Sequence, residues 1–305
     1  MGDPGFTMVQ LRYFAAAAEL RSMTAAARQF SVTQSTISTA VGQLERHLGV
    51  QLLIRRHAQG LALTEAGSRF LQESRAFLAH ARDLVDGARG LGEALVGDVT
   101  VGCFQTIAPF YLPRLLADFA GRYPAVRVSL LEQEIPELQH ALFAGGCEVA
   151  LLYDLDLDDQ LDTELLTKAA PYVIVPAEHR FAARSSLWLS DLAGAPLVLL
   201  DLPHSREYFQ ALVKRTRVEP RIAYRSCNFE TVRALVAAGH GFALLNQCPA
   251  AATTYDGGRV AALPLLDDIP ALPVVLARVR GVRPTARAQA FIDRCRAVIG
   301  QASPT

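Results

Sequence analysis

The chain has 305 residues, which is too long for one ordinary domain and fits two or three domains. Hydrophobic residues make up 51% of it and charged residues 20%, a composition that excludes a disordered chain and allows sizeable cores. The 30 Lys and Arg residues balance 30 Asp and Glu residues. Over the whole chain, this net charge of zero argues against a nucleic-acid partner, because proteins that bind phosphate usually carry a basic surplus.

The cysteines and the apolar runs exclude further classes. Five cysteines are scattered along the chain: Cys103, Cys147, Cys227, Cys248 and Cys295. Their spacing predicts neither a disulfide framework nor a zinc site, and their odd number fits a reducing cytoplasm. No apolar run approaches the roughly 20 residues of a membrane span, and no secretion signal is visible. An acidic run over residues 154–164 is predicted to be a solvated loop. We therefore expect a cytoplasmic protein that needs no metal and no cofactor.

Residues 1–64 predict a small helical domain with a wing, preceded by a tail over residues 1–7. Apolar side chains at helical spacing predict three short helices, ending near Arg21, Phe30 and His47. Two short apolar segments around a polar tip, over residues 51–63, then predict a β-wing. This arrangement is typical of a compact domain that displays one helix and one hairpin.

The second and third helices fit a helix-turn-helix. Ala27 is small where the two helices would cross, Ser31 occupies the turn, and Ile37 would lock the pair. This geometry presents the start of the third helix to the major groove of DNA. The polar residues expected to contact DNA there are Thr33, Gln34, Ser35, Thr36, Ser38 and Thr39. Arg55 and Arg56 of the wing would contact phosphates or the minor groove. The alternative is a protein–protein module with a solvated Ser/Thr face.

The distribution of charge supports the DNA hypothesis. Residues 1–64 contain six arginines against Asp3, Glu19 and Glu45, which leaves an excess of three positive charges. The acidic residues collect farther along the chain, so the net charge of zero averages over two regions with different partners.

Residues 65–96 predict one long linker helix. Side chains at seven-residue spacing form two rows along it, and such rows are typical of a seam between two helices. The residues expected at the dimer seam are Phe70, Phe77, Ala81, Leu84, Ala88 and Leu91. The alternative is an amphipathic helix that packs only on its own domain.

Residues 97–305 alternate between predicted strands and helices, which favours parallel sheets covered by helices. The segments divide into subdomain I, about 97–170 and 270–305, and subdomain II, about 171–269. Two such units joined by two crossings predict a ligand cleft between them, at the carboxyl ends of the strands.

Nearly the whole chain resembles the LysR-type transcriptional regulators. The resemblance is carried at the N-terminus by Ala26–Arg28, Thr33–Ser38, Gln43–Glu45, Leu48–Gly49, Leu52–Arg55 and Leu63–Gly67, and later by Leu112–Val126 and Leu235–Leu245. It implies a winged helix-turn-helix that reads operator DNA, a linker-helix dimer that is commonly assembled into a tetramer, contact with RNA polymerase, and an effector domain like a periplasmic binding protein. Leu53, Thr39 and Glu148 depart from the family pattern, and Thr39 puts one phosphate contact in doubt.

The resemblance places the effector in the cleft, at loops that can be located in this chain. The residues expected to contact it are Phe104, Gln105, Thr106, Glu132, Glu134, His204, Ser205, Cys227, Asn228 and Asn246, with Gln247 beside the last. Thr106 and Ser205 could instead cap helices. The two acids would oppose a dianion, which favours a zwitterion, an amide or a heterocyclic effector.

Enzyme hypotheses find little support, since the chain has no GxSxG elbow, no Walker loop and no GxGxxG motif. A nucleophile formed by Cys103 or Cys227 with His204 is disfavoured, and redox sensing through Cys103, Cys227 or Cys248 stays open. The sequence thus predicts a regulator that binds operator DNA as a homo-oligomer and responds to a small molecule. The alternative is a solute-binding or enzymatic α/β protein with a helical assembly module.

Overall fold

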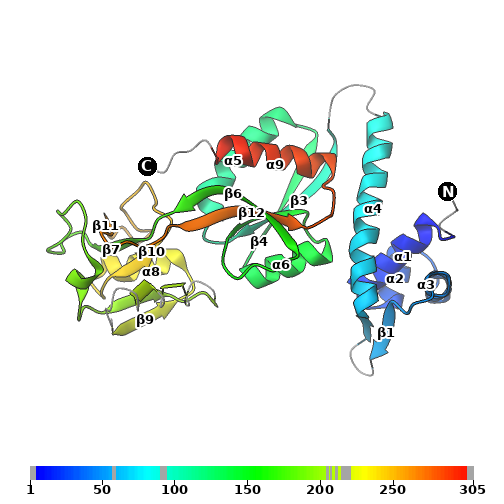
Figure 1. Cartoon of the computed structure of the whole chain (residues 1–305), viewed down its shortest axis with the longest axis horizontal. Coiled ribbons are helices and arrows are strands. Elements are labelled where there is room, and N and C mark those ends of the chain that lie inside the picture. The colour runs from blue at the N-terminus through cyan, green and yellow to red at the C-terminus, as the bar shows by residue number, and fades with distance from the viewer. Residues whose placement is uncertain are drawn as a thin grey trace.

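The computed structural model describes residues 5–56, 60–89, 95–203, 206, 208–209, 212–213 and 221–300. Figure 1 shows a helical unit at the N-terminal end, one long helix beside it, and an α/β region in two parts. Buried apolar residues form two separate clusters, one in the helical unit with the start of the long helix, and one through both parts of the α/β region. The two regions therefore fold around separate cores.

The N-terminal unit has the helices and the wing that the sequence predicts. Its elements are α1 (Met8–Glu19), α2 (Met23–Gln29), α3 (Gln34–Leu48), β1 (Leu53–Arg56) and β2 (Gly60–Leu63). Each helix begins at a hydroxyl side chain that accepts a backbone N–H of the first turn: Thr7 for α1, Ser22 for α2 and Thr33 for α3. Such caps satisfy donors that have no partner inside the helix, which is why the chain turns at these residues.

The long helix α4 (Glu65–Arg89) follows the wing directly. Thr64 caps it, since the Thr64 hydroxyl accepts the N–H of Gly67 at 2.8 Å. A Cβ on Gly67 would lie 2.0 Å from the carbonyl oxygen of Leu52, so only glycine lets α4 start this close to the wing. The predicted helix over residues 65–96 is too long, because residues 95 and 96 are not helical; residues 90–94 lie outside the described ranges. Within those ranges, no helix is long and apolar enough to cross a membrane.

Subdomain I is built on a five-stranded sheet with the order β4-β3-β5-β12-β6. Its strands are β3 (Gly97–Phe104), β4 (Val126–Gln133), β5 (Val149–Tyr153), β6 (Leu161–Ala169) and β12 (Leu272–Val279). Its helices are α5 (Ala108–Arg122), α6 (Ile135–Ala144) and α9 (Ala286–Val298). The strands β4, β3 and β5 are parallel, whereas β12 runs antiparallel to both of its neighbours. The expectation of purely parallel sheets is therefore wrong for this half of the sheet.

The prediction of a solvated loop over residues 154–164 is wrong at its end. Asp162 and Glu164 lie on the edge strand β6 and make ion pairs with arginines of β12 and α9. Glu164 binds the guanidinium of Arg296 through both carboxylate oxygens, at 2.6 Å each. The two acidic side chains attach the edge strand β6 to its neighbours. A strand that contains such charged residues has the polar composition of a loop, which explains the error.

Subdomain II contains two small sheets. The strands β7 (Tyr172–Pro176), β10 (Ala243–Leu245) and β11 (Val260–Pro264) form an antiparallel sheet with β7 in the centre. The strands β8 (Leu197–Leu200) and β9 (Ile222–Ser226) pair in parallel, and a bridge between Leu197 and Phe242 joins them to the first sheet. The helix α8 (Phe229–Ala237) and the 3-10 helix η1 (Leu189–Leu192) also belong to this subdomain. The chain crosses between the subdomains after β6 and before β12.

Candidate DNA-binding surface and effector cleft

The turn between α2 and α3 sets the angle at which α3 is displayed. Ser31 adopts a left-handed conformation with φ of 54°, and the N–H of Val32 donates to the carbonyl of Ala27 at 3.0 Å. Ala27 and Ile37 are fully buried between the two helices. These three positions play the roles that the sequence assigned to them, and they present the first turn of α3 to solvent.

The first turns of α3 expose a polar surface without acidic side chains. Gln34, Ser35, Thr36 and Thr39 are exposed, and Ser38 is half-buried. The Thr33 hydroxyl lies 2.7 Å from that of Ser35 and accepts the N–H of Thr36 at 3.2 Å, so Thr33 acts first as the cap of the helix. The amide of Gln34 makes no hydrogen bond within the described ranges, which leaves it free for a base edge.

The wing is fixed to α3 by a half-buried carboxylate. Glu45 accepts the backbone N–H groups of Leu52 and Leu53 at 2.8 and 3.0 Å, directly before and at the start of β1. The positions of Arg55 and Arg56 are paired with Leu61 and Gly60 across the hairpin. Their side chains lie outside what the structure describes, so their contact with DNA stays a prediction.

The N-terminal unit exposes its excess of positive charge to solvent. Glu45 is used by the wing, and Glu19 forms an ion pair with Arg75 of α4 at 2.8 Å. Within the described residues, the side chains of Arg21 and Arg28 have no acidic partner. The unit therefore presents positive charge and neutral hydrogen-bonding groups, which is the combination that a DNA duplex attracts.

The residues of the predicted dimer seam on the linker helix α4 lie in two environments: the core of the N-terminal unit and the exposed surface. The ring of Phe70 packs 5.5 Å from that of Phe14, so Phe70 belongs to the core of the N-terminal unit. In contrast, Phe77 is 52% exposed and Leu84 is 76% exposed, while Ala81 is half-buried. The Ala88 side chain and Leu91 lie outside the described part of the chain.

A pocket between the two subdomains is lined by aromatic and amide side chains. Its polar lining consists of Thr106, Tyr153, Tyr208, Asn246 and Gln247. The amide of Gln247 donates to the Tyr153 hydroxyl at 3.0 Å, and the amide of Asn246 donates to the Tyr208 hydroxyl at 3.2 Å. The free volume is about 10 Å³, close to the space of one water molecule. The cleft is therefore narrow, and its polar groups are paired with one another.

The predicted effector residues fall into four groups. Thr106 and Asn246 line the pocket, and Phe104 packs against Tyr153 with ring centroids 5.5 Å apart. Gln105 is hydrogen-bonded to Glu134 outside the described lining of the pocket, and Asn228 caps α8 by accepting the N–H of Thr231 at 2.9 Å. Two further predicted residues, Glu132 and Cys227, are exposed. His204 and Ser205 lie outside the described ranges.

The tyrosines of the cleft were missed by the sequence analysis. Tyr153 ends the otherwise aliphatic strand β5, which is the signal that could have identified it. Burial raises the pKa of the Tyr153, Tyr208 and Tyr111 hydroxyls, and hydrogen bonds from amides oppose that rise. These hydroxyls are consequently neutral at physiological pH and can both donate and accept hydrogen bonds.

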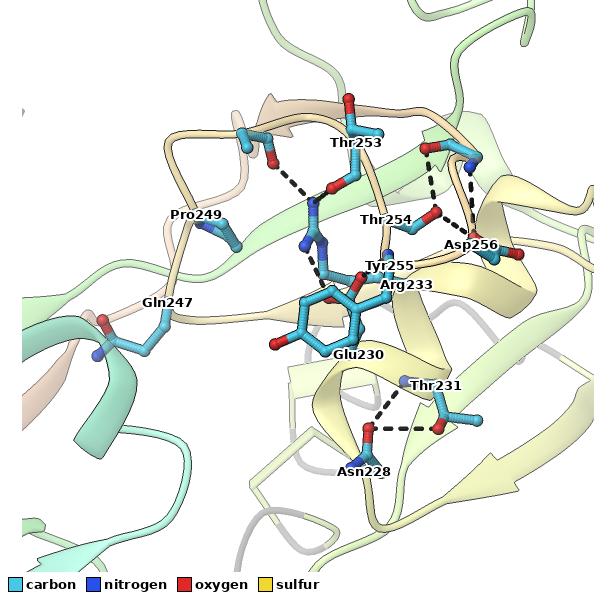
Figure 2. Close-up of polar contacts among 12 residues, drawn as sticks. Asn228, Glu230, Thr231, Arg233, Gln247, Pro249, Thr253, Thr254, Tyr255 and Asp256 are labelled. Atoms are coloured by element: carbon cyan, nitrogen blue, oxygen red, sulfur yellow. Dashed lines mark hydrogen bonds and ion pairs between the residues drawn. The ribbon is translucent and has the colours of Figure 1, made fainter.

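The loop after Gln247 is tied to α8 by a buried arginine. Arg233 donates to Glu230 at 2.7 Å and to the carbonyl of Ala251 at 2.7 Å. The contact between Arg233 and Glu230 is visible in Figure 2. Glu230 also accepts the N–H of Tyr255 at 2.8 Å. This ion pair fixes residues that follow the cleft in the chain and so supports the position of the Gln247 segment.

Three of the five cysteines, Cys103, Cys147 and Cys295, are buried and poorly placed for nucleophilic chemistry, whereas Cys227 and Cys248 are exposed. All five are free thiols. Burial raises the pKa of Cys147 to about 12, and burial also raises the pKa of Cys103 and Cys295. A protonated, buried thiol is a weak nucleophile, which disfavours the proposed role of Cys103. In the described residues, no group of three His, Cys, Asp or Glu side chains could hold a metal ion.

A winged helix-turn-helix, a linker helix and a two-part domain with a cleft define a DNA-binding regulator with an effector domain. The model of the lysR-family bacterial regulatory helix-turn-helix protein matches residues 8–68, and the LysR substrate binding domain matches residues 92–300. The chain belongs to the LysR family of transcriptional regulators.

Named relatives agree with this assignment. The regulator TfdS of Cupriavidus pinatubonensis is 31% identical over 297 residues, which are 96% of this chain and 98% of the relative. The structure of HinK, a LysR-family regulator of Pseudomonas aeruginosa, is 36% identical with a TM-score of 0.66 and covers 98% of this chain and 100% of that one. Full-length CbnR complexed with its target DNA is 26% identical with a TM-score of 0.57, covering 96% of this chain and 100% of that one. These relatives are regulators rather than enzymes.

Proposed function

We propose that this regulator binds its operator through the start of α3 and the wing. The observation that carries the proposal is the first turn of α3, where Gln34, Ser35 and Thr36 are exposed next to an arginine excess. Gln34 would read an adenine by a bidentate hydrogen bond, and the hydroxyls would contact bases or phosphates. Arg55 and Arg56 would contact phosphates beside the major groove.

The functional unit proposed is a dimer through α4, assembled further into a tetramer, in the cytoplasm. Exposed Phe77 and Leu84 support the dimer, since both lie on one face of α4 at a spacing of seven residues. In the tetramer, the N-terminal units would bind DNA in pairs. A rearrangement of these pairs would allow contact with RNA polymerase. A footprint on the DNA upstream of the protein's own gene tests this: two protected half-sites separated by whole helical turns are expected. One continuous, unphased protected region would contradict it.

The effector proposed for the cleft is a neutral or zwitterionic planar molecule with hydrogen-bonding groups. Its support is the lining, in which four aromatic side chains accompany two amides and the described residues include no charged side chain. An effector would replace the internal pairs of Asn246 and Gln247, and so would open the two subdomains. No metal or cofactor is part of this proposal.

A thermal-shift screen tests the effector proposal on the full chain. Neutral aromatic amides and heterocycles are expected to raise the melting temperature, because a ligand that binds only the folded state stabilises it. Gln247→Ala should remove the shift. Exclusive stabilisation by dicarboxylates, or an unchanged shift in the variant, would contradict the assigned chemistry.

A further inference from the structure

A second and larger cavity lies between the N-terminal unit and subdomain I. Its volume is about 430 Å³, within the range of small-metabolite sites and far above that of the subdomain cleft. One wall comes from α1, the end of α2 and α4; the other comes from β3, the end of α6 and the segment between β12 and α9. His80 of α4 lies 3.4 Å from the carbonyl of Pro284 across this boundary. Figure 1 shows α4 standing beside subdomain I on the side of α6.

The cavity is lined by more positive than negative side chains. Its arginines are Arg12, Arg75, Arg278, Arg283 and Arg287. Its carboxylates are Glu19, Asp98 and Glu148. Five guanidinium groups against three carboxylates leave a positive excess in a partly enclosed space, where electrostatic attraction is stronger than in bulk water.

Several of these charges already serve the fold. Glu148 accepts the N–H and the hydroxyl of Thr285 at 3.0 and 3.1 Å, which fixes the start of α9. Arg287 donates to the carbonyls of Val96 and Asp98, at 3.1 and 3.0 Å. Arg278 pairs with Asp162, at 3.3 Å. Those side chains are structural, and the cations that remain are Arg12, Arg75 and Arg283.

Arg75 is the most informative of the three. Its Nη2 pairs with Glu19 at 2.8 Å, but its Nη1 is buried and has no hydrogen-bond partner among the described residues. The Arg75 side chain packs against Gly145 of subdomain I, where an added Cβ would lie 2.6 Å from Arg75 Cδ. A buried charged donor without an acceptor is costly. An anion that entered the cavity would satisfy it.

The other two cations are available on opposite walls. Arg12 of α1 lies over the ring of Phe30, 5.3 Å from its centroid, and makes no ion pair or hydrogen bond to any described residue. Arg283, in the segment between β12 and α9, is exposed and makes no ion pair or hydrogen bond to any described residue. The cations that could share one ligand thus belong to the two regions that have separate cores.

We propose that this cavity binds a small polyanion, either a phosphate ester or a di- or tricarboxylate, between Arg12 and Arg75 on one wall and Arg283 on the other. The ligand would favour the arrangement in which the N-terminal unit and subdomain I lie together. By thermodynamic linkage, its affinity and the affinity for DNA would then depend on each other. This site is separate from the cleft between the subdomains and would act as a second input to DNA binding.

Isothermal titration of the full-length protein, without DNA and at constant ionic strength, tests the proposal. Pyrophosphate and citrate are titrated separately, and their relative affinities distinguish a phosphate site from a carboxylate site. Arg283→Gln should weaken the preferred anion about tenfold or more, since a charge-assisted contact is lost. Arg114→Gln, at another exposed arginine of subdomain I, is the matched control and should stay within about twofold of the wild type.

A variant that is expected to raise anion affinity distinguishes this site from a general attraction of anions to the positively charged surface. Glu19→Gln removes the carboxylate that competes for Arg75 and should tighten the preferred anion, whereas Glu137→Gln on the exposed face of α6 should not. Because Arg283 lies outside the DNA-binding unit, loss of binding in Arg283→Gln cannot arise from anions on the DNA surface. Equal binding by wild type and Arg283→Gln, or no saturable binding of either anion, would overturn the proposal.

Discussion

The DNA-binding surface and the effector cleft differ in whether their polar groups already have hydrogen-bond partners within the protein. At the start of α3, Gln34 is exposed and has no hydrogen-bond partner among the described residues. In the cleft, Gln247 and Asn246 already donate to tyrosine hydroxyls, and the free space is about that of one water molecule. The first surface can meet its partner without rearrangement, whereas the second must break internal pairs and open. Binding of DNA and binding of an effector therefore differ in their structural cost.

The largest expected effect comes from the seam of α4, through which two copies of the chain are proposed to join. Phe77→Glu with Leu84→Glu should produce monomers, because like charges would replace two exposed apolar contacts. Operator affinity should fall about 100-fold or more, since two linked half-site contacts become one. Sedimentation and fluorescence anisotropy measure the two effects.

The matched control keeps the seam apolar. Phe77→Leu with Leu84→Ile should stay dimeric and bind DNA within about threefold of the wild type. A dimer that persists in the double glutamate variant would show that the two copies meet elsewhere.

A smaller loss is expected when the free amide on α3 is removed. Gln34→Ala should cost about 1–3 kcal/mol of discrimination at one base position and leave the other positions unchanged. Binding to a set of single-base operator variants measures it. Gln29→Ala removes an exposed amide at the end of α2 and should leave the base preference intact. If both variants behave alike, α3 does not read bases through Gln34.

The wing should contribute through charge rather than through base recognition. Arg55→Ala with Arg56→Ala should lower affinity for all sequences alike and reduce the slope of log affinity against log salt by about 2. Affinity measured between about 50 and 200 mM salt tests this. An unchanged slope would remove the wing from the DNA contact.

The smallest expected effect is a change in folding stability with pH that arises from the closed cleft. Burial raises the pKa of Tyr153 above the ordinary value of 10.0, so the folded protein retains this proton while the unfolded chain loses it. Stability should therefore fall as the pH rises above about 10, and Tyr153→Phe should weaken this fall. Melting temperatures on both sides of that pH measure the change. Tyr255→Phe, at a side chain that is 93% exposed, is the control and should follow the wild-type curve.

The N-terminal unit could be predicted from the sequence because its signals are local. Ser22 caps α2 and Thr64 caps α4, and Ser31, which the sequence places in the turn, adopts a left-handed conformation there. Each of these depends on residues three or four positions away. Short-range hydrogen bonds and helical periodicity are therefore sufficient to specify this region.

The effector region was predicted less completely because its structure depends on distant pairs. The antiparallel strand β12 returns from subdomain II to lie between β5 and β6, an order that no local pattern reveals. The edge strand β6 carries Asp162 and Glu164, and their carboxylates pair with arginines more than 100 positions later in the chain. In the cleft, the pair of Tyr153 and Gln247 likewise joins residues from two subdomains.

The most direct test of operator recognition is fluorescence anisotropy with DNA from upstream of the protein's own gene, in competition with a scrambled duplex of equal length. A Kd of about 10⁻⁸ M or tighter is expected at physiological salt, with a preference of about 1,000-fold or more over the scrambled sequence. Equal affinity for both duplexes would mean that the exposed start of α3 binds DNA only through charge, and would contradict sequence-specific binding.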